Sequence, residues 1–399
     1  MKFKALATLS LAMSLTILPN VGDVSAESEV KVPEKSKEVN VQVDKGNYVK
    51  GEVIVKFKDK GKNAKKALNG LNAEVAAEKD PVDSNFKVLE VGNVEAAVKA
   101  LNKNPNVEYA EPNYNFSATW TPNDYYYSSV QYGPQNTYTP SAWDYARGSS
   151  SQEIAVIDSG VDYTHPDLDG KTIRGYDFVD NDNYPMDENG HGTHVAGTAA
   201  AETNNSIGVA GMAPNTSILA VRALNASGSG SLADIADAIR YSADAGAEVI
   251  NLSLGCNCDT QTLENAVNYA WNSGSVVVAA AGNSGVSTTF EPASYANVIA
   301  VGAVDSSDNI ASFSNYGTWV DVTAPGVQIA STVPNNGYAY KSGTSMASPH
   351  VAGLAGLLAG QGRNNVQIRA AIENTADPIS GTGYYFEHGR INSFDAVRY

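Results

Sequence analysis

Three short polar segments carry residue types that together could cleave an acyl bond. They contain Asp158, directly after an apolar run, His191 in a glycine-rich segment, and Ser345 in a second glycine-rich segment. A serine nucleophile needs a base to take its proton, and the base needs a carboxylate that holds its tautomer. The order along the chain, Asp then His then Ser, occurs among known triads. The three segments therefore predict a serine hydrolase.

Each of the three residues also has an ordinary structural explanation. Asp158 could cap a turn at the end of a strand, and Ser345 could be the N-cap of a helix. His191 and His194 could bind zinc as a pair, although the signature H-E-x-x-H is absent, or His194 could be a packed core histidine. A non-catalytic binding protein on the same fold is a further alternative. Three glycine-flanked segments in this order favour the hydrolase.

The elements that must position these residues alternate between strand and helix. Nearly continuous apolar runs predict buried strands, and the segments between several of them have the apolar period of a helix. A parallel sheet with helices on both faces has this pattern, and its site residues gather at the carboxyl ends of the strands. The predicted fold is an α/β three-layer sandwich with a mostly parallel central sheet. The predicted strands are 153–157, 218–221, 249–254, 276–280 and 298–301, and the predicted helices are 232–245 and 263–272.

Residues 120–399 resemble the subtilisin family of serine proteases, in particular its thermitase-like members. The likeness rests on the segments 156–160, 191–197 and 343–353. The resemblance implies that Ser345 is the nucleophile, that His191 is the general base and then the general acid, and that Asp158 orients His191. It also implies that the side-chain amide of Asn283 donates to the developing oxyanion.

The resemblance further implies an endopeptidase with broad protein substrates. An extended peptide would pair with two strand ends that flank the main specificity pocket. Phe290 and Glu291 depart from common patterns near the base of this pocket, which leaves its side-chain preference open. The implied substrate-binding residues are Ser253, Leu254, Gly255, Ala281 and Gly282.

Calcium is the cofactor that the resemblance implies, at two or three sites. Carboxylates, amide oxygens and backbone carbonyls are the ligands that this cation prefers. The tight site would use Asp124, Asp167, Asn205 and carbonyls of Glu202, Ile207 and Val209. A second would use Asp177, Asp180 and Asp182 with carbonyls near Tyr184 and Met186, although these acids could instead form an exposed acidic turn. A third, weaker site for calcium or sodium would lie near Ala293, Tyr295, Val298 and Asp321.

Cys256 and Cys258 are the two cysteines of the chain. A C-x-C bridge closes a very small ring, so it removes little entropy from the unfolded chain. Export would make oxidation plausible, and a metal site would need further ligands nearby. We expect a local disulfide rather than free thiols, next to the strand end at Leu254 and Gly255.

The first 119 residues predict a leader and a small domain. Residues 1–26 have a basic start, an apolar run and small residues at a cleavage point, as in a secretory signal peptide. Within 27–119, strand and helix patterns follow the order β-α-β-β-α-β, an α+β ferredoxin-like layout, with Asn93 as a helix N-cap. Residues 48–113 resemble the family's inhibitory propeptide, which assists folding and is cut away. The segment before Trp120 resembles a self-processing site.

Charge separates the same regions. The formal net charge of the chain is −16, with 17 Lys+Arg and 16 Asp+Glu in residues 1–119 but 10 and 27 in residues 120–399. The acidic part argues against a nucleic-acid partner, and no strand is followed by the dinucleotide motif G-x-G-x-x-G. No other run reaches the length of a membrane span. We expect a secreted, extracellular monomer whose partners are polypeptide substrates and its own propeptide.

Overall fold

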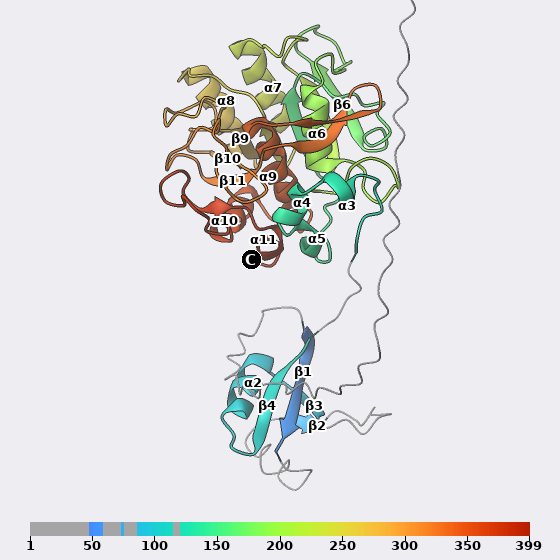
Figure 1. The fold of residues 1–399 in the computed structure, drawn as a ribbon, viewed down its shortest axis with the longest axis vertical. Coiled ribbons are helices and arrows are strands. Elements are labelled where there is room, and N and C mark those ends of the chain that lie inside the picture. The colour runs from blue at the N-terminus through green and yellow to red at the C-terminus, as the bar shows by residue number, and fades with distance from the viewer. Residues whose placement is uncertain (1–47, 59–72, 76–85, 115–119) are drawn as a thin grey trace, which may run out of the picture. The chain divides into compact units, whose positions relative to one another are not determined.

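The computed structural model describes residues 48–58, 73–75, 86–114 and 120–399. The chain divides into two compact units, Met1–Tyr114 and Asn115–Tyr399, which are described separately (Figure 1). Three predictions lie outside the described residues: the signal peptide at 1–26, the first of the two helices expected within 27–119, which the pattern places at 62–71, and the self-processing segment before Trp120, at 116–119.

The small unit is built around an antiparallel sheet with the order β2-β3-β1-β4. Between β3 and β4 in the chain comes α2, and β1 lies between these two strands in the sheet, which is the split βαβ arrangement that the sequence predicts. The side chain of Asn93 accepts a hydrogen bond from the Ala96 N–H and caps α2. The elements are β1 (Tyr48–Phe57), β2 (Ala73–Val75), β3 (Lys87–Val91), α2 (Val94–Asn102) and β4 (Val107–Tyr114).

The large unit is organised by an eight-stranded sheet with the order β14-β11-β10-β9-β8-β5-β7-β6. Every pairing in this sheet is parallel, so the predicted fold class is confirmed. The strands are β5 (Glu153–Asp158), β6 (Thr172–Asp177), β7 (Ser217–Arg222), β8 (Val249–Leu252), β9 (Val276–Ala280), β10 (Val298–Val304), β11 (Val322–Pro325) and β14 (Gly389–Arg390).

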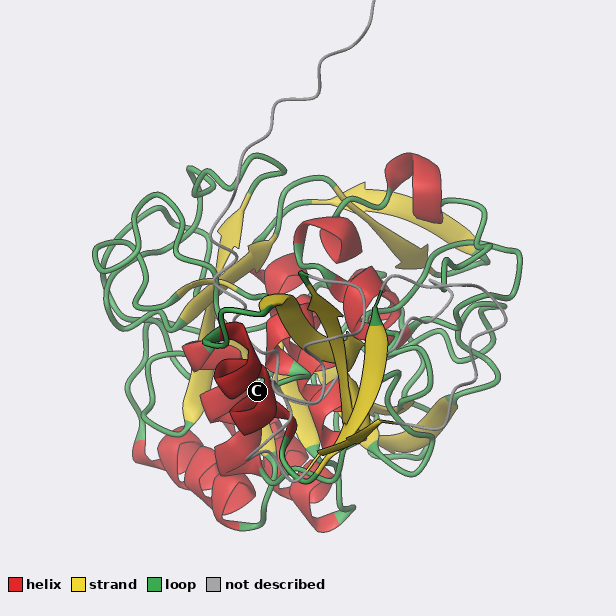
Figure 2. Cartoon of the chain, turned by 90° about the horizontal axis from the view of Figure 1, so that it is seen from below, coloured by secondary structure: helices red, strands yellow, loops and turns green. Residues whose placement is uncertain are grey.

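Helices cover both faces of this sheet and make two apolar cores. Successive side chains of a strand point to opposite faces: Ile154 and Val156 of β5 belong to one core, and Ile157 belongs to the other. The first core is shared with α6 (His191–Ala200), α9 (Thr344–Ala359) and α10 (Asn365–Asn374), the second with α7 (Leu232–Asp244) and α8 (Gln261–Asn272). These are the three predicted layers, whose helices and strands Figure 2 separates by colour.

The remaining elements lie at the margins of the large unit. A hairpin of β12 (Ile329–Val333) and β13 (Gly337–Lys341) contacts α6 through β12. Among the described ranges, no helix is both long and apolar enough to cross a membrane. The short helices are α3 (Tyr127–Val130), α4 (Gly133–Asn136), α5 (Thr139–Ala142) and α11 (Ser393–Ala396).

One strand is shorter than predicted. The sequence predicts a strand over 249–254, but β8 ends at Leu252, where its register with β9 also ends. Ser253, Leu254 and Gly255 therefore lie beyond the paired part of the sheet. Their backbone is the part of this segment that an extended peptide could pair with.

Candidate active site

The sheet order brings three of the predicted site residues to one edge. Neighbours β5, β8 and β9 run in parallel, so their carboxyl ends meet at the same edge. Asp158 is the last residue of β5, Ser253 follows β8, and Asn283 comes three residues after the end of β9. Residues far apart in the sequence are thus neighbours along this edge.

His191 begins α6 and is hydrogen bonded to Asp158. Its Nδ1 lies 2.8 Å from Oδ1 of Asp158, whose side chain is fully buried. A side chain at Gly192 would collide with the backbone of Gly160 and approach the Asp158 Cβ, so only glycine lets the two elements come this close. Burial lowers the pKa of His191, but the charge of Asp158 and its hydrogen bond outweigh burial and leave that pKa raised. This pairing holds the other ring nitrogen ready as a proton acceptor.

A second buried carboxylate, Asp187, holds the start of α6 and was not predicted from the sequence. It accepts hydrogen bonds from the Ser159 hydroxyl, from the N–H groups of Asn189 and Gly190, and from both the N–H and the hydroxyl of Thr193. These donors include orphan groups at the N-terminus of α6. The available signal was an acidic residue four positions before His191.

Ser345 is the second residue of α9. Its hydroxyl donates to the Ser253 carbonyl at 3.1 Å and not to His191. Ser253 and His191 both line a cavity of about 640 Å³, so Ser345 is hydrogen bonded to a residue of the wall that His191 also lines. Catalytic hydrogen bonds are often long or poorly aligned without substrate and tighten in the complex. The structure thus joins Asp158 to His191 and leaves the last link of the set unmade.

Asn283 is fixed by Thr344, at the start of α9. The Thr344 N–H donates to the amide oxygen of Asn283 at 2.8 Å, and the Thr344 hydroxyl donates to the same oxygen at 3.0 Å. A backbone N–H can only donate, so the amide oxygen must face it. The NH₂ group of Asn283 is then the part left to donate elsewhere. The Thr344 hydroxyl in turn accepts from the Gly282 N–H at 3.1 Å, so Thr344 is a further supporting residue that the sequence analysis missed.

The predicted substrate-binding residues fall into two sets. Ser253, Leu254 and Gly255 line the cavity of about 640 Å³. Ala281 is fully buried and Gly282 has no side chain, so these two residues can offer only backbone groups. The φ of Gly282 is +98°, a conformation that favours glycine. A side chain at Gly255 would run into the ring of Phe290 and the carbonyl of Glu291, which explains glycine at the cavity wall.

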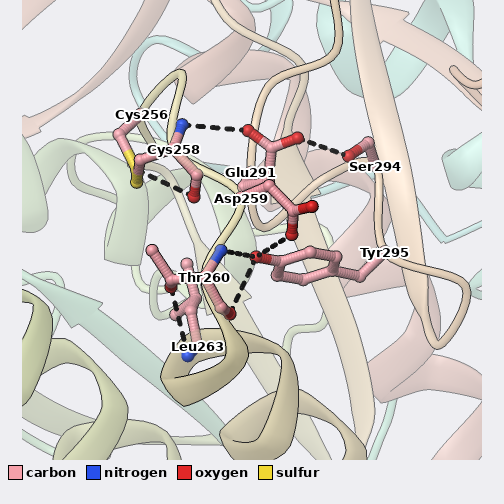
Figure 3. Close-up of a disulfide and its surroundings, with 8 residues drawn as sticks. All are labelled: Cys256, Cys258, Asp259, Thr260, Leu263, Glu291, Ser294 and Tyr295. Atoms are coloured by element: carbon pink, nitrogen blue, oxygen red, sulfur yellow. Dashed lines mark hydrogen bonds between the residues drawn. A yellow bond between two sulfur atoms is a disulfide. The ribbon is translucent and has the colours of Figure 1, made fainter.

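The wall of the same cavity carries a disulfide between Cys256 and Cys258 (Figure 3). Glu291 holds this segment, because its buried carboxylate accepts from the Cys258 N–H at 3.2 Å and from the Ser294 hydroxyl at 3.0 Å. The backbones of Cys256 and Glu291 also exchange two hydrogen bonds. Both carboxylate oxygens of Glu291 therefore have donors before any substrate binds.

The alternative of a zinc pair does not suit His194. Its Nε2 faces the carbonyls of Ile329 at 2.9 Å and Ala339 at 3.2 Å, so that nitrogen must carry the hydrogen. Burial, the first cause, lowers the pKa of His194 to about 3. His194 is therefore a neutral core histidine that ties α6 to the hairpin of β12 and β13.

The residues of the predicted tight calcium site lie together. The Asn205 side chain donates to Asp167 at 2.8 Å, and the Val209 N–H donates to the same carboxylate at 2.9 Å. The Asn204 N–H donates to Oδ2 of Asp124, while Oδ1 of Asp124 is buried and lacks a hydrogen-bond partner within the described structure. Burial raises the pKa of both carboxyl groups. An orphaned buried carboxylate oxygen beside a second carboxylate and an amide fits a hard cation.

The acids of the predicted second site already have a cation, Arg222. Its Nη1 lies 2.9 Å from Asp177 and 2.8 Å from Asp180, and its Nη2 lies 2.7 Å from Glu188. Asp177 also accepts from two backbone N–H groups, and Asp182 accepts from the Tyr184 N–H at 2.8 Å. In this arrangement the three acids do not fit a calcium ion, because Arg222 holds two of them.

The predicted third site also has a basic partner. Oδ1 of Asp321 lies 3.3 Å from Arg369, and its Oδ2 accepts from the Ala300 N–H at 2.8 Å. Burial raises the pKa of Asp321 to about 6. Across the described ranges, no cluster of three or more His, Cys, Asp or Glu residues forms a metal-binding group. Ala293, Tyr295 and Val298 precede or begin β10 and could contribute only carbonyl oxygens, apart from the Tyr295 hydroxyl, which bonds the Thr260 backbone.

Comparison with known proteins agrees with this geometry. Residues 149–391 match the family described as the subtilase family (Peptidase_S8), and residues 34–113 match the fervidolysin N-terminal prodomain. The chain is 69% identical to the thermophilic serine proteinase of Bacillus sp. strain AK1, over 100% of both chains. It is 60% identical to thermitase of Thermoactinomyces vulgaris, over 70% of this chain and 100% of thermitase.

A solved structure gives the same result for the fold. It is a protease of Pseudoalteromonas arctica PAMC 21717, with a TM-score of 0.64 and 32% identity, covering 70% of this chain and 99% of that one. The predicted family and the predicted class of enzyme, a peptide hydrolase, are confirmed. The chain belongs to the subtilase family of serine proteases, as a thermitase-like member preceded by a prodomain.

Proposed function

We propose that this chain is the precursor of a secreted, calcium-stabilised serine endopeptidase that acts through an acyl-enzyme on Ser345. The observation that carries the proposal is the hydrogen bond between Asp158 and Nδ1 of His191, at the carboxyl edge to which α9 also brings Ser345. It fixes the tautomer that a base toward Ser345 requires.

The chemistry follows from the positions of these groups. His191 takes the proton of the Ser345 hydroxyl as its oxygen attacks the peptide carbonyl, and Asp158 stabilises the imidazolium that forms. The Asn283 NH₂ and the Ser345 N–H, at the start of α9, donate to the oxyanion. His191 then gives the proton to the leaving amine. Water repeats the sequence on the acyl-enzyme and releases the acid.

The proposed division of the chain assigns residues 1–26 to export, 27–119 to an intramolecular inhibitor and folding aid, and 120–399 to the peptidase. The prodomain match at 34–113 and the compact unit that ends at Tyr114 support the middle part. The product is an extracellular monomer that acts on polypeptides and first cuts its own chain near Trp120. Cys256 and Cys258 are oxidised in it, as export allows.

Calcium has a stabilising role in the proposal. When bound beside Asp124 and Asp167, with Asn205 and nearby carbonyls, the ion supplies positive charge to two buried carboxylates and takes no part in the chemistry. The orphaned Oδ1 of Asp124 supports this site. At the second site Arg222 pairs with two of the acids in place of an ion, and the third site stays a prediction in which Arg369 pairs with Asp321.

Replacement of Ser345 by alanine tests the proposal. We expect secreted, folded protein that keeps the mass of the unprocessed precursor and hydrolyses peptides at least about 10⁵-fold more slowly. Mass spectrometry, N-terminal sequencing and labelling by a fluorophosphonate report the three points separately. Wild-type protein labelled at Ser345 and starting near Trp120 is the expected control. Full activity or self-processing in Ser345→Ala would overturn the assignment of the nucleophile.

A further inference from the structure

The backbone carbonyl of Ser345 lacks its usual hydrogen-bond donor within α9, because that position is a proline. In an α-helix the carbonyl of residue i accepts from the N–H of residue i+4. For Ser345 that residue is Pro349, inside α9, which has no N–H to donate. The Ser345 carbonyl is instead bonded by the Ser253 hydroxyl at 2.9 Å. α9 therefore lacks one of its helical hydrogen bonds, and the Ser253 hydroxyl, just after β8, supplies the replacement donor.

Ser345 and Ser253 are joined twice as a result. The hydroxyl of Ser345 donates to the carbonyl of Ser253, and the hydroxyl of Ser253 donates to the carbonyl of Ser345. Both bonds join the residue that would attack the peptide to the segment that would pair with the peptide. One of these two bonds depends on the orientation of the Ser253 hydroxyl.

That orientation is imposed by a buried asparagine, Asn251, on β8. Its Nδ2 donates to the Ser253 hydroxyl oxygen at 3.0 Å, and its Oδ1 accepts from the Ser348 hydroxyl at 2.7 Å. Asn251 and Ser348 are fully buried. Because each hydroxyl has one hydrogen, the chain of bonds runs in a single direction from Ser348 to the Ser345 carbonyl. If the amide of Asn251 were reversed, its oxygen would face Ser253, and the single hydroxyl hydrogen of Ser253 would be drawn to that oxygen instead of the Ser345 carbonyl.

We propose that Asn251 is a positioning residue for the nucleophile, acting through Ser253 and held in orientation by Ser348. This inference rests on the proposed role of Ser345. An asparagine on a fully buried strand costs free energy unless its amide is fully bonded, and here both ends of the amide are used on the one path that leads to the nucleophile. A small displacement of a reacting group strongly lowers the reaction rate. Loss of the hydrogen bonds from Ser348 through Asn251 to Ser253 therefore lowers the rate of the chemical step.

Four variants test the proposal in the full chain. Ser348→Ala removes the donor to Asn251, and Ser348→Thr restores a hydroxyl with one added methyl group. Asn251→Leu has a similar shape and no donor. Ser242→Ala is the matched control, because Ser242 is equally buried and its hydroxyl donates only to the Ala238 carbonyl within α7. For each variant, kcat, KM and the rate of Ser345 phosphonylation by a small fluorophosphonate are measured per folded molecule.

The expected pattern separates positioning from stability. Ser348→Ala lowers kcat and the phosphonylation rate about tenfold, the worth of one buried hydrogen bond, while KM changes less than about twofold. Asn251→Leu lowers both rates further, Ser348→Thr restores them, and Ser242→Ala leaves them unchanged. If Asn251→Leu does not fold, the Ser348 pair still decides.

Two results would overturn the inference. Unchanged rates per folded molecule in Ser348→Ala would show that the path serves stability alone. A rise in KM with an unchanged phosphonylation rate would show that it serves only the substrate strand. A wild-type protein that a fluorophosphonate does not label at Ser345 would instead refute the proposed function and is distinguishable from both results.

Discussion

The two units of this chain use their sheets differently. In the small unit the strands are antiparallel, and most residues of β1 are only partly buried. In the large unit β7, β8, β9, β10 and β11 are buried along their whole length. A parallel sheet that helices cover on both faces holds polar groups at the carboxyl ends of its strands. An antiparallel sheet commonly has one face packed on the core and the other face exposed.

The distribution of reactive residue types agrees with this difference. All five His and both Cys follow residue 119, and so do Asp158 and Ser345. The described core of the small unit is a single cluster of Val, Leu and Ala residues from β1, β3, α2 and β4. The residue types of the candidate site therefore all belong to the large unit. The predictions below test this contrast.

Among the tests of this contrast, the largest effect is expected for Asn283→Leu, because this change in the large unit removes a donor to the oxyanion. We expect kcat to fall about 10²–10³-fold, as for other donors of this type, with little change in KM. Steady-state kinetics on a peptide p-nitroanilide measure it. Thr344→Val, which removes one of the two bonds that orient the amide, should show a smaller loss of the same kind. A kcat close to that of the wild type would show that Asn283 does not donate to the oxyanion.

The second test asks whether the small unit acts on folding. A parallel sheet assembled from strands far apart in sequence closes many long loops, which slows folding. We expect residues 120–399 refolded alone to give at least about tenfold less active enzyme than the full chain refolded under the same conditions. Separately added residues 27–119 should restore the yield. Equal yields without residues 27–119 would show that the small unit does not assist folding of the large unit.

The sequence was sufficient for the fold class and for some of the residues that begin or end elements, although it placed the end of β8 two residues too late. Asp158 and His191 could be found because the first ends a strand and the second begins a helix, each with glycine nearby, and α2 because Asn93 caps it. Arg222 could not be foreseen, because only the pairing of β6 with β7 brings it to Asp177. The path through Asn251 depends likewise on how β8 packs against α9, although a polar residue in an apolar strand was a visible signal.

Removal of calcium should affect the two units unequally. In Ser345→Ala protein, which avoids self-digestion, EDTA should lower the melting temperature of the large unit by roughly 10 °C, since a ligand at about 1,000 times its Kd contributes about 4 kcal/mol. The transition of the small unit should stay unchanged. Calorimetry with and without added calcium measures both. Asp124→Asn should lose most of the response, whereas Asp180→Asn, whose carboxylate pairs with Arg222, should keep it. An unchanged melting temperature under EDTA would refute the tight site.

The smallest effect is expected from removing the positive charge of Lys341, which lies next to His191. Nζ of Lys341 donates to the carbonyl of Gly190, next to His191, at 2.8 Å, and its positive charge lowers the pKa of His191 against the raising effect of Asp158. His191 must be neutral to act as a base, so activity is lost as the pH falls through its pKa. Lys341→Met removes the repulsion, raises that pKa and moves the acid limb of kcat/KM to higher pH.

Lys341→Arg is the matched control, because it keeps the charge and should leave the acid limb in place. The difference between the two variants should shrink at high salt, as screening weakens the interaction of partly exposed charges. If Lys341→Met moves the limb to lower pH, or if both variants move it equally, the charge of Lys341 does not act on His191. Lys341→Met changes no residue of the small unit, so the melting temperature of that unit in the Ser345→Ala precursor should not change when Lys341→Met is added.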